Sequence, residues 1–158
     1  MILLLLSFLL DSILSNYFPY SILSLTWFQP CFYVITMVSL YFYHRKKDDF
    51  FQKGMFYTII GSLLFGNSLI TRVISYLCIY IFLNTFSRKY HFHMKTFLLA
   101  IILSLLIHFG SSYLIFIVNK KIAFSFILFL WQYIHYLLFN MILGIIIYYF
   151  FGINKQVR

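Results

Sequence analysis

Long runs of apolar residues, separated by short polar segments, dominate the sequence. In order, the apolar runs cover residues 2–18, 30–43, 54–65, 69–86, 96–118 and 122–151. A helix needs about 20 residues to cross roughly 30 Å of hydrocarbon. The pattern therefore predicts an all-α membrane protein, a bundle of about six transmembrane helices in a single domain over 1–158. A transmembrane β-barrel would need segments of about ten residues with alternating polarity.

Some features refine these boundaries. Pro30 suits the first turn of a helix, so we expect the second helix to begin there and 20–29 to lie at the membrane interface. The last run exceeds a perpendicular crossing, which predicts a tilted or protruding helix. The first run carries Asp11 and lacks a basic start, so we interpret it as a retained span. Polar segments predict loops or turns at 44–49, 66–68, 87–95 and 119–121.

Composition supports this interpretation. Hydrophobic residues make up 63% of the chain and charged residues 9%, whereas soluble domains average roughly 25% charged residues. The net charge of +9 comes from basic residues at the ends of apolar runs, so nucleic-acid binding is not expected. Cytoplasmic loops of membrane proteins carry the excess of Lys and Arg. With both termini cytoplasmic, the basic residues on the outer side would be only Arg72, Lys120 and Lys121.

Polar residues within the apolar runs are the candidate functional positions. Asp11 lies halfway along the first run, where a bare carboxylate costs at least about 2.5 kcal/mol. His108 and His135 fall at a similar depth, and Gln132 lies one turn from His135. These residues could relay protons or cations, fix the packing of the helices through hydrogen bonds, or form a cleft for a partner's helix. Packing or partner docking is favoured, because transporters show more polar groups at mid-membrane depth.

Motifs for catalysis or for binding cofactors are not recognised in the sequence, so no enzyme activity and no cofactor are expected. His91 and His93 flank one residue in a basic loop, but no third ligand is nearby, so no metal site is expected. Cys31 and Cys78 lie in or beside apolar runs and are interpreted as packed thiols.

The layout resembles the rod shape-determining protein MreD family of bacteria. The resemblance rests on LLDS at 9–12, on QPCFYV at 29–34, where a proline opens the second helix, and on KGMFYTIIGSLLFGNSL at 53–69. Two basic loops, two long final helices and a short basic tail complete the match over essentially the whole chain. Members often carry an acidic residue near the end of the third helix, where this chain has Ser62.

The resemblance implies a multi-pass protein of the bacterial cell membrane that is a non-enzymatic scaffold of the cell-elongation machinery. Its expected partners are membrane lipids, the bitopic shape protein MreC and other membrane proteins of the elongation complex, which together link the actin-like cytoskeleton to peptidoglycan synthesis. The family's fold is similar to the substrate-binding subunits of energy-coupling-factor vitamin transporters. Such a transporter subunit is therefore the alternative function.

Overall fold

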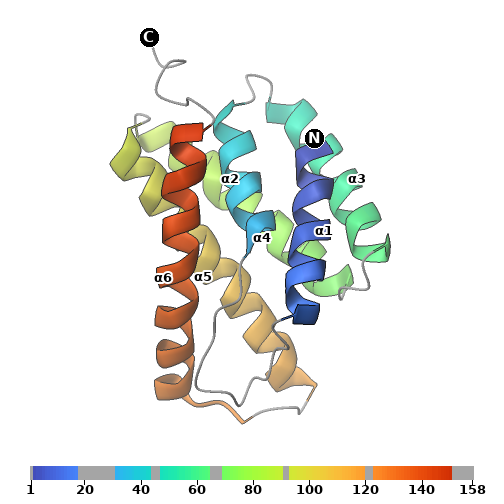
Figure 1. Ribbon diagram of the computed structural model, residues 1–158, viewed down its shortest axis with the longest axis vertical. Helices are drawn as coiled ribbons and strands as arrows, with labels where there is room; N and C mark the ends of the chain where they lie inside the picture. Colours follow the sequence, from blue (N-terminus) through green and yellow to red (C-terminus); the bar gives the residue numbers. More distant parts are fainter. Residues whose placement is uncertain are drawn as a thin grey trace.

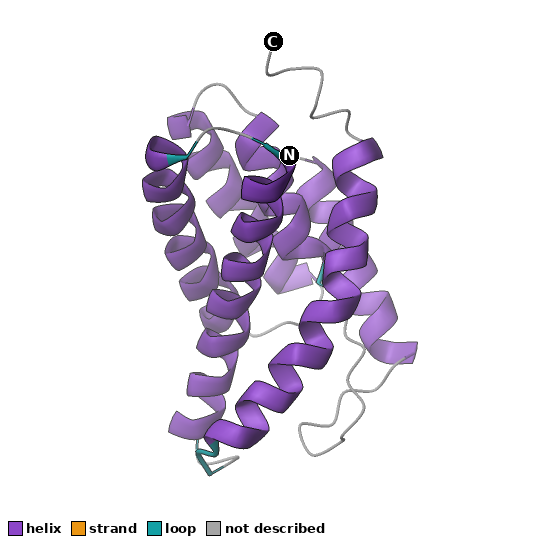
Figure 2. Ribbon diagram, turned by 90° about the vertical axis from the view of Figure 1, so that its left-hand side faces the viewer, coloured by secondary structure: helices purple, strands orange, loops and turns teal. Residues whose placement is uncertain are grey.

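The structure of the protein is a computed structural model that describes residues 2–17, 31–43, 47–64, 69–90, 93–119 and 123–150. Within these ranges the regular structure consists of six helices and no strand (Figure 2). The predicted all-helical fold is therefore confirmed. The helices are α1 (Ile2–Tyr17), α2 (Phe32–Tyr43), α3 (Lys47–Leu64), α4 (Leu69–Lys89), α5 (Met94–Val118) and α6 (Phe126–Phe150).

The last three helices are long and apolar enough to cross a membrane. With 25 residues each, α5 and α6 reach about 37 Å at 1.5 Å per residue. Helix α1, as far as Leu14, and helix α2 are apolar but shorter, and α3 begins with charged residues. The chain thus has the helices of a membrane protein, whereas the crossing of the bilayer by all six helices stays a prediction.

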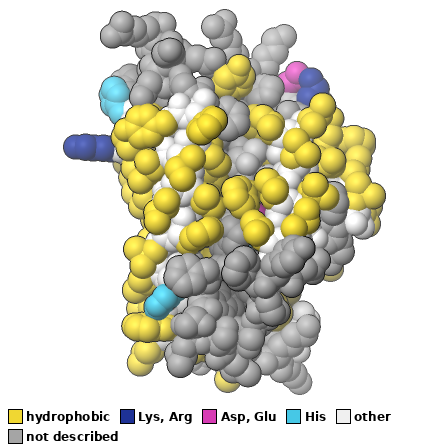
Figure 3. Space-filling view, in the orientation of Figure 1, with side chains coloured by type: hydrophobic (Ala, Val, Ile, Leu, Met, Phe, Trp, Pro, Cys, Tyr) yellow, Lys and Arg dark blue, Asp and Glu magenta, His cyan; other side chains and the backbone are white. Residues whose placement is uncertain are grey.

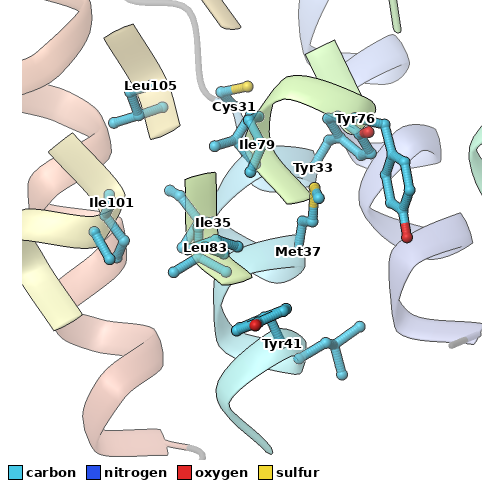
Figure 4. Close-up of a cluster of buried hydrophobic side chains, with 14 of the residues drawn as sticks. Cys31, Tyr33, Ile35, Met37, Tyr41, Tyr76, Ile79, Leu83, Ile101 and Leu105 are labelled. Carbon is cyan, nitrogen blue, oxygen red and sulfur yellow. The ribbon is translucent and has the colours of Figure 1, made fainter. Parts of the chain in front are cut away.

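Helix α2 lies at the centre of the bundle (Figure 1), where it contacts α1, α3, α5 and α6. Every residue from Tyr33 to Tyr41 is buried, which is typical of a helix that is apolar on all sides. Figure 4 shows Tyr33, Ile35 and Met37 of this helix among buried side chains of α4 and α5. Helix α2 is therefore enclosed by protein on all sides rather than by lipid.

Charged side chains gather toward one end of the bundle. The start of α1 and the end of α6 lie at this end (Figure 1), and Figure 3 shows dark blue and magenta groups toward it above a largely hydrophobic surface. Arg88 and Lys89 are in the last turn of α4 and Lys95 is in the first turn of α5, both of which lie at this end, whereas Arg72 is in the first turn of α4 at the other end. This arrangement agrees with a positively charged cytoplasmic face, although the side on which this end lies stays a prediction.

Three predicted boundaries were wrong by three residues or more, while α2 and α5 begin two residues from their predicted starts at Pro30 and Thr96. Helix α3 begins at Lys47 rather than at Gly54, because Asp49 pairs with Lys53 at 2.9 Å one turn later and stabilises a polar helical start. Helix α4 continues through Lys89, where basic residues interact favourably with the helix dipole. Helix α6 begins at Phe126, four residues later than expected, where the Ser125 hydroxyl accepts a bond from the Leu128 N–H at 3.4 Å. The predicted interfacial segment 20–29 lies outside the described residues.

Gly61 and Gly110 differ in the free space around their Cα atoms, and the lack of space at Gly61 bears on the packing of α1 against α3. A Cβ atom added to Gly61 of α3 would lie 2.6 Å from the ring of Phe8 in α1. At Gly110 of α5, an added Cβ atom would meet nothing within 4 Å. Of these two glycines, Gly61 is therefore the one needed for close contact between helices.

Candidate functional site

The first turn of α2 lies inside the bundle, and side chains of α1 and α6 accept its backbone hydrogen bonds. The Asp11 carboxylate of α1 accepts the N–H of Phe32 at 2.8 Å and that of Tyr33 at 3.1 Å, one on each oxygen. The Asn140 side-chain carbonyl of α6 accepts the N–H of Cys31 at 2.7 Å. Asp11 and Asn140 are 6% and 0% exposed. Three successive N–H groups are therefore bound by two other helices.

This arrangement follows from the physics of a helix start. The first N–H groups of a helix have no partner within the helix, and each costs several kcal/mol when it is left unsatisfied in hydrocarbon. The N-terminus also carries a partial positive charge that favours a carboxylate. Asp11 meets both demands. It fixes α1 against α2, while Asn140, whose NH2 group also donates to the Tyr136 carbonyl at 2.7 Å, fixes α6.

Arg72 brings a positive charge to the same region. Its guanidinium carbon lies 5.4 Å from the centre of the Phe8 ring and 5.2 Å from that of Tyr33, which is cation–π geometry. Arg72 attracts Asp11 electrostatically, although no direct ion pair joins these two described side chains. Its Nη1 atom is buried and has no hydrogen-bond partner among the described residues. Arg72 belongs to the first turn of α4, within the predicted fourth run, and its guanidinium packs against buried rings of α1 and α2. That this end of α4 lies on the outer side of the membrane stays a prediction.

Asp11 and Arg72 form a buried polar cluster around Tyr33, and His108 of α5 contacts this cluster through the Tyr33 ring. It is 9% exposed, and its ring meets the Tyr33 ring edge-on with 6.2 Å between centroids. Its Nδ1 atom is buried without a hydrogen-bond partner among the described residues. Tyr33 is thus the common neighbour of Asp11, Arg72 and His108, and its hydroxyl lies 3.4 Å from that of Thr58 in α3.

The two remaining candidate residues occupy different environments. Gln132 of α6 is 2% exposed and faces the interior. His135 lies one turn further along α6, where its Nδ1 atom is 2.9 Å from the carbonyl of Trp131 and its ring packs against the Trp131 ring. Both of these contacts lie within its own helix. The structure brings Asp11 and His108 to one cluster around Tyr33, whereas His135 contacts Trp131 of its own helix.

The hydrogen bonds of Asp11 are those of a buried helix cap. Both Asp11 oxygens bind backbone N–H groups, so the carboxylate has a structural task. Among the described residues no three His, Cys, Asp or Glu side chains are grouped as a metal site. Cys31 is buried, Cys78 is exposed, and neither forms a disulfide within the described parts of the chain. Of the histidine pair in the basic loop, His93 is exposed and His91 lies outside the described residues.

Some members of the cluster carry weak sequence signals. Arg72 lies near the start of the fourth apolar run, four residues beyond the Gly-Asn-Ser segment, whereas its contact with buried rings emerges only from the packing. Asn140 is visible as a polar residue in an apolar run, but nothing in its surroundings connects it to Cys31, which is 109 positions away. The backbone groups that Asp11 binds have no side-chain signature, although Pro30 indicates that a helix begins nearby.

No protein-family model, no curated protein and no solved structure matches this chain. The buried cluster and the surface of the bundle are therefore the observations from which a function is inferred.

Proposed function

We propose that this chain is a non-enzymatic membrane scaffold of the bacterial cell-elongation machinery. In this proposal it spans the cell membrane six times with both termini in the cytoplasm. It binds a bitopic shape protein of the MreC type and helps to couple the actin-like cytoskeleton to peptidoglycan synthesis. Support comes from the resemblance at 9–12, 29–34 and 53–69, and from helices long and apolar enough for a membrane.

The observation that carries the proposal is that buried polar side chains form their hydrogen bonds within the bundle. Asp11 and Asn140 bind the start of α2, so these residues hold the bundle together. Large apolar side chains on the outer faces of the long helices are exposed, among them Ile74, Leu106 and Ile142. A bundle with such a surface meets its partners chiefly through helix contacts within the lipid.

The alternative, a substrate-binding subunit of an energy-coupling-factor type vitamin transporter, is favoured by two observations. Transporters bind substrates at broken helices whose N-termini lie near mid-membrane, and α2 begins inside the bundle. Arg72 and His108 also carry buried nitrogen atoms without described partners. Against this alternative, the N–H groups at the start of α2, which would bind an anionic substrate, are already bound to Asp11 and Asn140.

Photocrosslinking in native membranes distinguishes the two functions. A photoreactive amino acid is placed at Ile142 and at Leu106, which are 60% and 37% exposed, and as a control at Ile101, which is fully buried. The scaffold proposal expects the two exposed positions to capture a bitopic protein with a coiled-coil ectodomain, and the buried position to capture nothing. Capture of the membrane or ATPase subunits of a transporter would instead support the alternative and overturn the scaffold.

A further inference from the structure

Exposed side chains form a stripe along the outer face of α6, which lies at the edge of the bundle (Figure 1). Within the apolar stretch of each long helix, 17% of the residues are buried in α6, against 33% in α4 and in α5. The other side of α6 contacts α5 and α2. This stripe, here called the α6 stripe, includes Ile127, Trp131, Leu138, Ile142, Ile146 and Tyr149, which are 47–82% exposed.

The length and spacing of the α6 stripe match a single transmembrane helix. Its members recur at steps of three, four or seven residues, which places them on one face of the helix. From Ile127 to Tyr149 the stripe rises about 33 Å at 1.5 Å per residue, and the hydrocarbon core is roughly 30 Å thick. An apolar helix that crosses the membrane beside α6 would therefore cover the whole stripe.

Two neighbouring polar groups interrupt this apolar surface in the first half of α6. Trp131 is 50% exposed, and His135, one turn later, is partly exposed. Their rings pack with 4.7 Å between centroids, and His135 Nδ1 lies 2.9 Å from the Trp131 carbonyl oxygen. A carbonyl oxygen only accepts, so Nδ1 carries a proton, and because a charge is costly in hydrocarbon the ring is neutral. His135 Nε2 is therefore a hydrogen-bond acceptor, whereas the Trp131 indole N–H is a donor.

Neither His135 Nε2 nor the Trp131 indole N–H has a hydrogen-bond partner among the described residues. His135 lies nine residues from Phe126, the first residue of α6, which is about 13 Å along the axis. Because the helix exceeds the hydrocarbon core by about 6 Å, His135 lies about 7–14 Å below the core surface wherever along the helix the core is placed. Histidines in membrane helices almost always face protein or a water-filled cavity. A polar group of another protein is therefore expected beside His135.

The combination of a donor and an acceptor selects the occupant. The side chains of Asn, Gln, Ser and Thr both donate and accept, and they join helices within membranes; lipid acyl chains have neither group. Two copies of this chain share one orientation in the membrane, so in a twofold-symmetric pair each α6 residue faces its own counterpart. A second copy would then set donor against donor at Trp131 and acceptor against acceptor at His135. A helix of a different protein has no such constraint.

We propose that the α6 stripe is the docking face for the transmembrane helix of a single-span partner, and that this helix presents a side-chain amide or hydroxyl to His135 and Trp131. The proposal rests on the proposed scaffold function, and it adds the face of the bundle and the chemistry by which the bitopic partner is recognised. The aliphatic members of the stripe pack along the partner helix, whereas the polar pair fixes the depth at which the two helices meet.

Photocrosslinking of the full chain in native membranes tests the docking face. A photoreactive amino acid replaces Leu138 of the α6 stripe, and the matched control replaces Leu114 of α5; both leucines are 61% exposed. We expect the probe at Leu138 to capture a single-span protein whose membrane segment contains Asn, Gln, Ser or Thr, and the probe at Leu114 to capture little of it. Equal capture at both positions would refute the α6 stripe as the docking face, as would capture of a second copy of this chain at Leu138.

Substitutions of the polar pair test the recognition chemistry. A hydrogen bond between membrane helices contributes about 0.6 kcal/mol on average, which corresponds to about threefold at about 1.4 kcal/mol for each factor of ten. His135→Leu should therefore reduce capture at Leu138 about threefold, whereas His135→Gln, which keeps an acceptor, should retain it. Trp131→Phe keeps an aromatic ring without the donor and should also lose about threefold. Unchanged capture in His135→Leu and in Trp131→Phe would overturn the proposed recognition.

A double-mutant cycle identifies the contact and separates this inference from the scaffold function. The amide or hydroxyl residue of the captured helix is replaced by leucine, alone and together with His135→Leu. The effects of two residues in contact are not additive, so the double variant should lose little more than either single variant, and additive losses would contradict the contact. If a bitopic partner were captured only outside α6, this inference would fail while the scaffold function stood. If no position captured one, the scaffold function itself would fail.

Discussion

The cap that Asp11 forms on α2 leads to a quantitative expectation for Asp11→Leu. The substitution removes the acceptors of two backbone N–H groups, which lie 2.8 and 3.1 Å from the carboxylate oxygens. Bonds to charged groups contribute about 1.5–3 kcal/mol each in soluble proteins, whereas bonds between membrane helices average about 0.6 kcal/mol. Here the donors are backbone groups at the start of a helix inside the bundle, and Arg72 also loses its nearby opposite charge. We therefore expect a loss of about 3 kcal/mol.

The measurement is thermal unfolding of the purified full chain in mild detergent. At about 2–4 °C per kcal/mol for a chain of this size, Asp11→Leu should lower the melting temperature by about 6–12 °C. Asp11→Asn keeps one acceptor oxygen and loses the charge, so it should fall between Asp11→Leu and the unaltered protein. Both variants should still insert into membranes, because the first apolar run is unchanged or more apolar.

The matched control is Asp49→Asn. It removes the carboxylate of an exposed ion pair with Lys53, and such a pair on a helix contributes about 0.3–0.5 kcal/mol. If Asp11→Leu melted within a degree or two of Asp49→Asn, Asp11 would not cap α2. If Asp11→Asn and Asp11→Leu melted together, well below the unaltered protein, the charge rather than the acceptor geometry would dominate.

Other substitutions test further features of the bundle. Asn140→Leu should cost about 1–3 kcal/mol, because a buried N–H group loses its acceptor; an unchanged melting temperature would contradict this role. Gly61→Ala should lower the melting temperature through its clash with an aromatic ring of α1, whereas Gly110→Ala should preserve or raise it, since alanine favours the helix by up to about 1 kcal/mol. In a cysteine-free background, single cysteines at Lys46 and Lys120 should react with membrane-impermeant reagents from opposite sides, the first from the cytoplasm; the reverse pattern would invert the orientation.

Apolar runs predict the helices of this chain well, because a helix needs apolar side chains whether protein or lipid covers it. The end of α5 at Val118 and the start of α4 at Leu69 coincide with the ends of such runs. Where a helix extends into water the signal is lost, so the polar first turns of α3 were interpreted as a loop. There the stabilisation comes from the pair of Asp49 and Lys53, which apolarity does not reveal.

In the candidate site, some residues can be predicted from the sequence, but their contacts cannot. Asp11 and His108 are conspicuous because polar groups are costly in lipid, and the structure places both beside Tyr33. Their contacts could not be inferred from the sequence. The partners of Asp11, for example, are backbone N–H groups, which no side chain reveals. Arg72 was expected near the outer end of the fourth run, and its contact with the rings of Phe8 and Tyr33 could not be inferred, because those rings belong to α1 and α2.

The acceptors at the start of α2 also constrain the order in which the protein is assembled. Asp11 is synthesised before α2, but Asn140 emerges 109 residues after its partner Cys31. At 12 residues, or about 18 Å, α2 is too short to cross a bilayer by itself. Until α6 is synthesised, the Cys31 N–H lacks the Asn140 acceptor, and the final helix supplies it. Truncation before α6 should accordingly expose the nascent chain to membrane proteases at α2 as well as at the cut end.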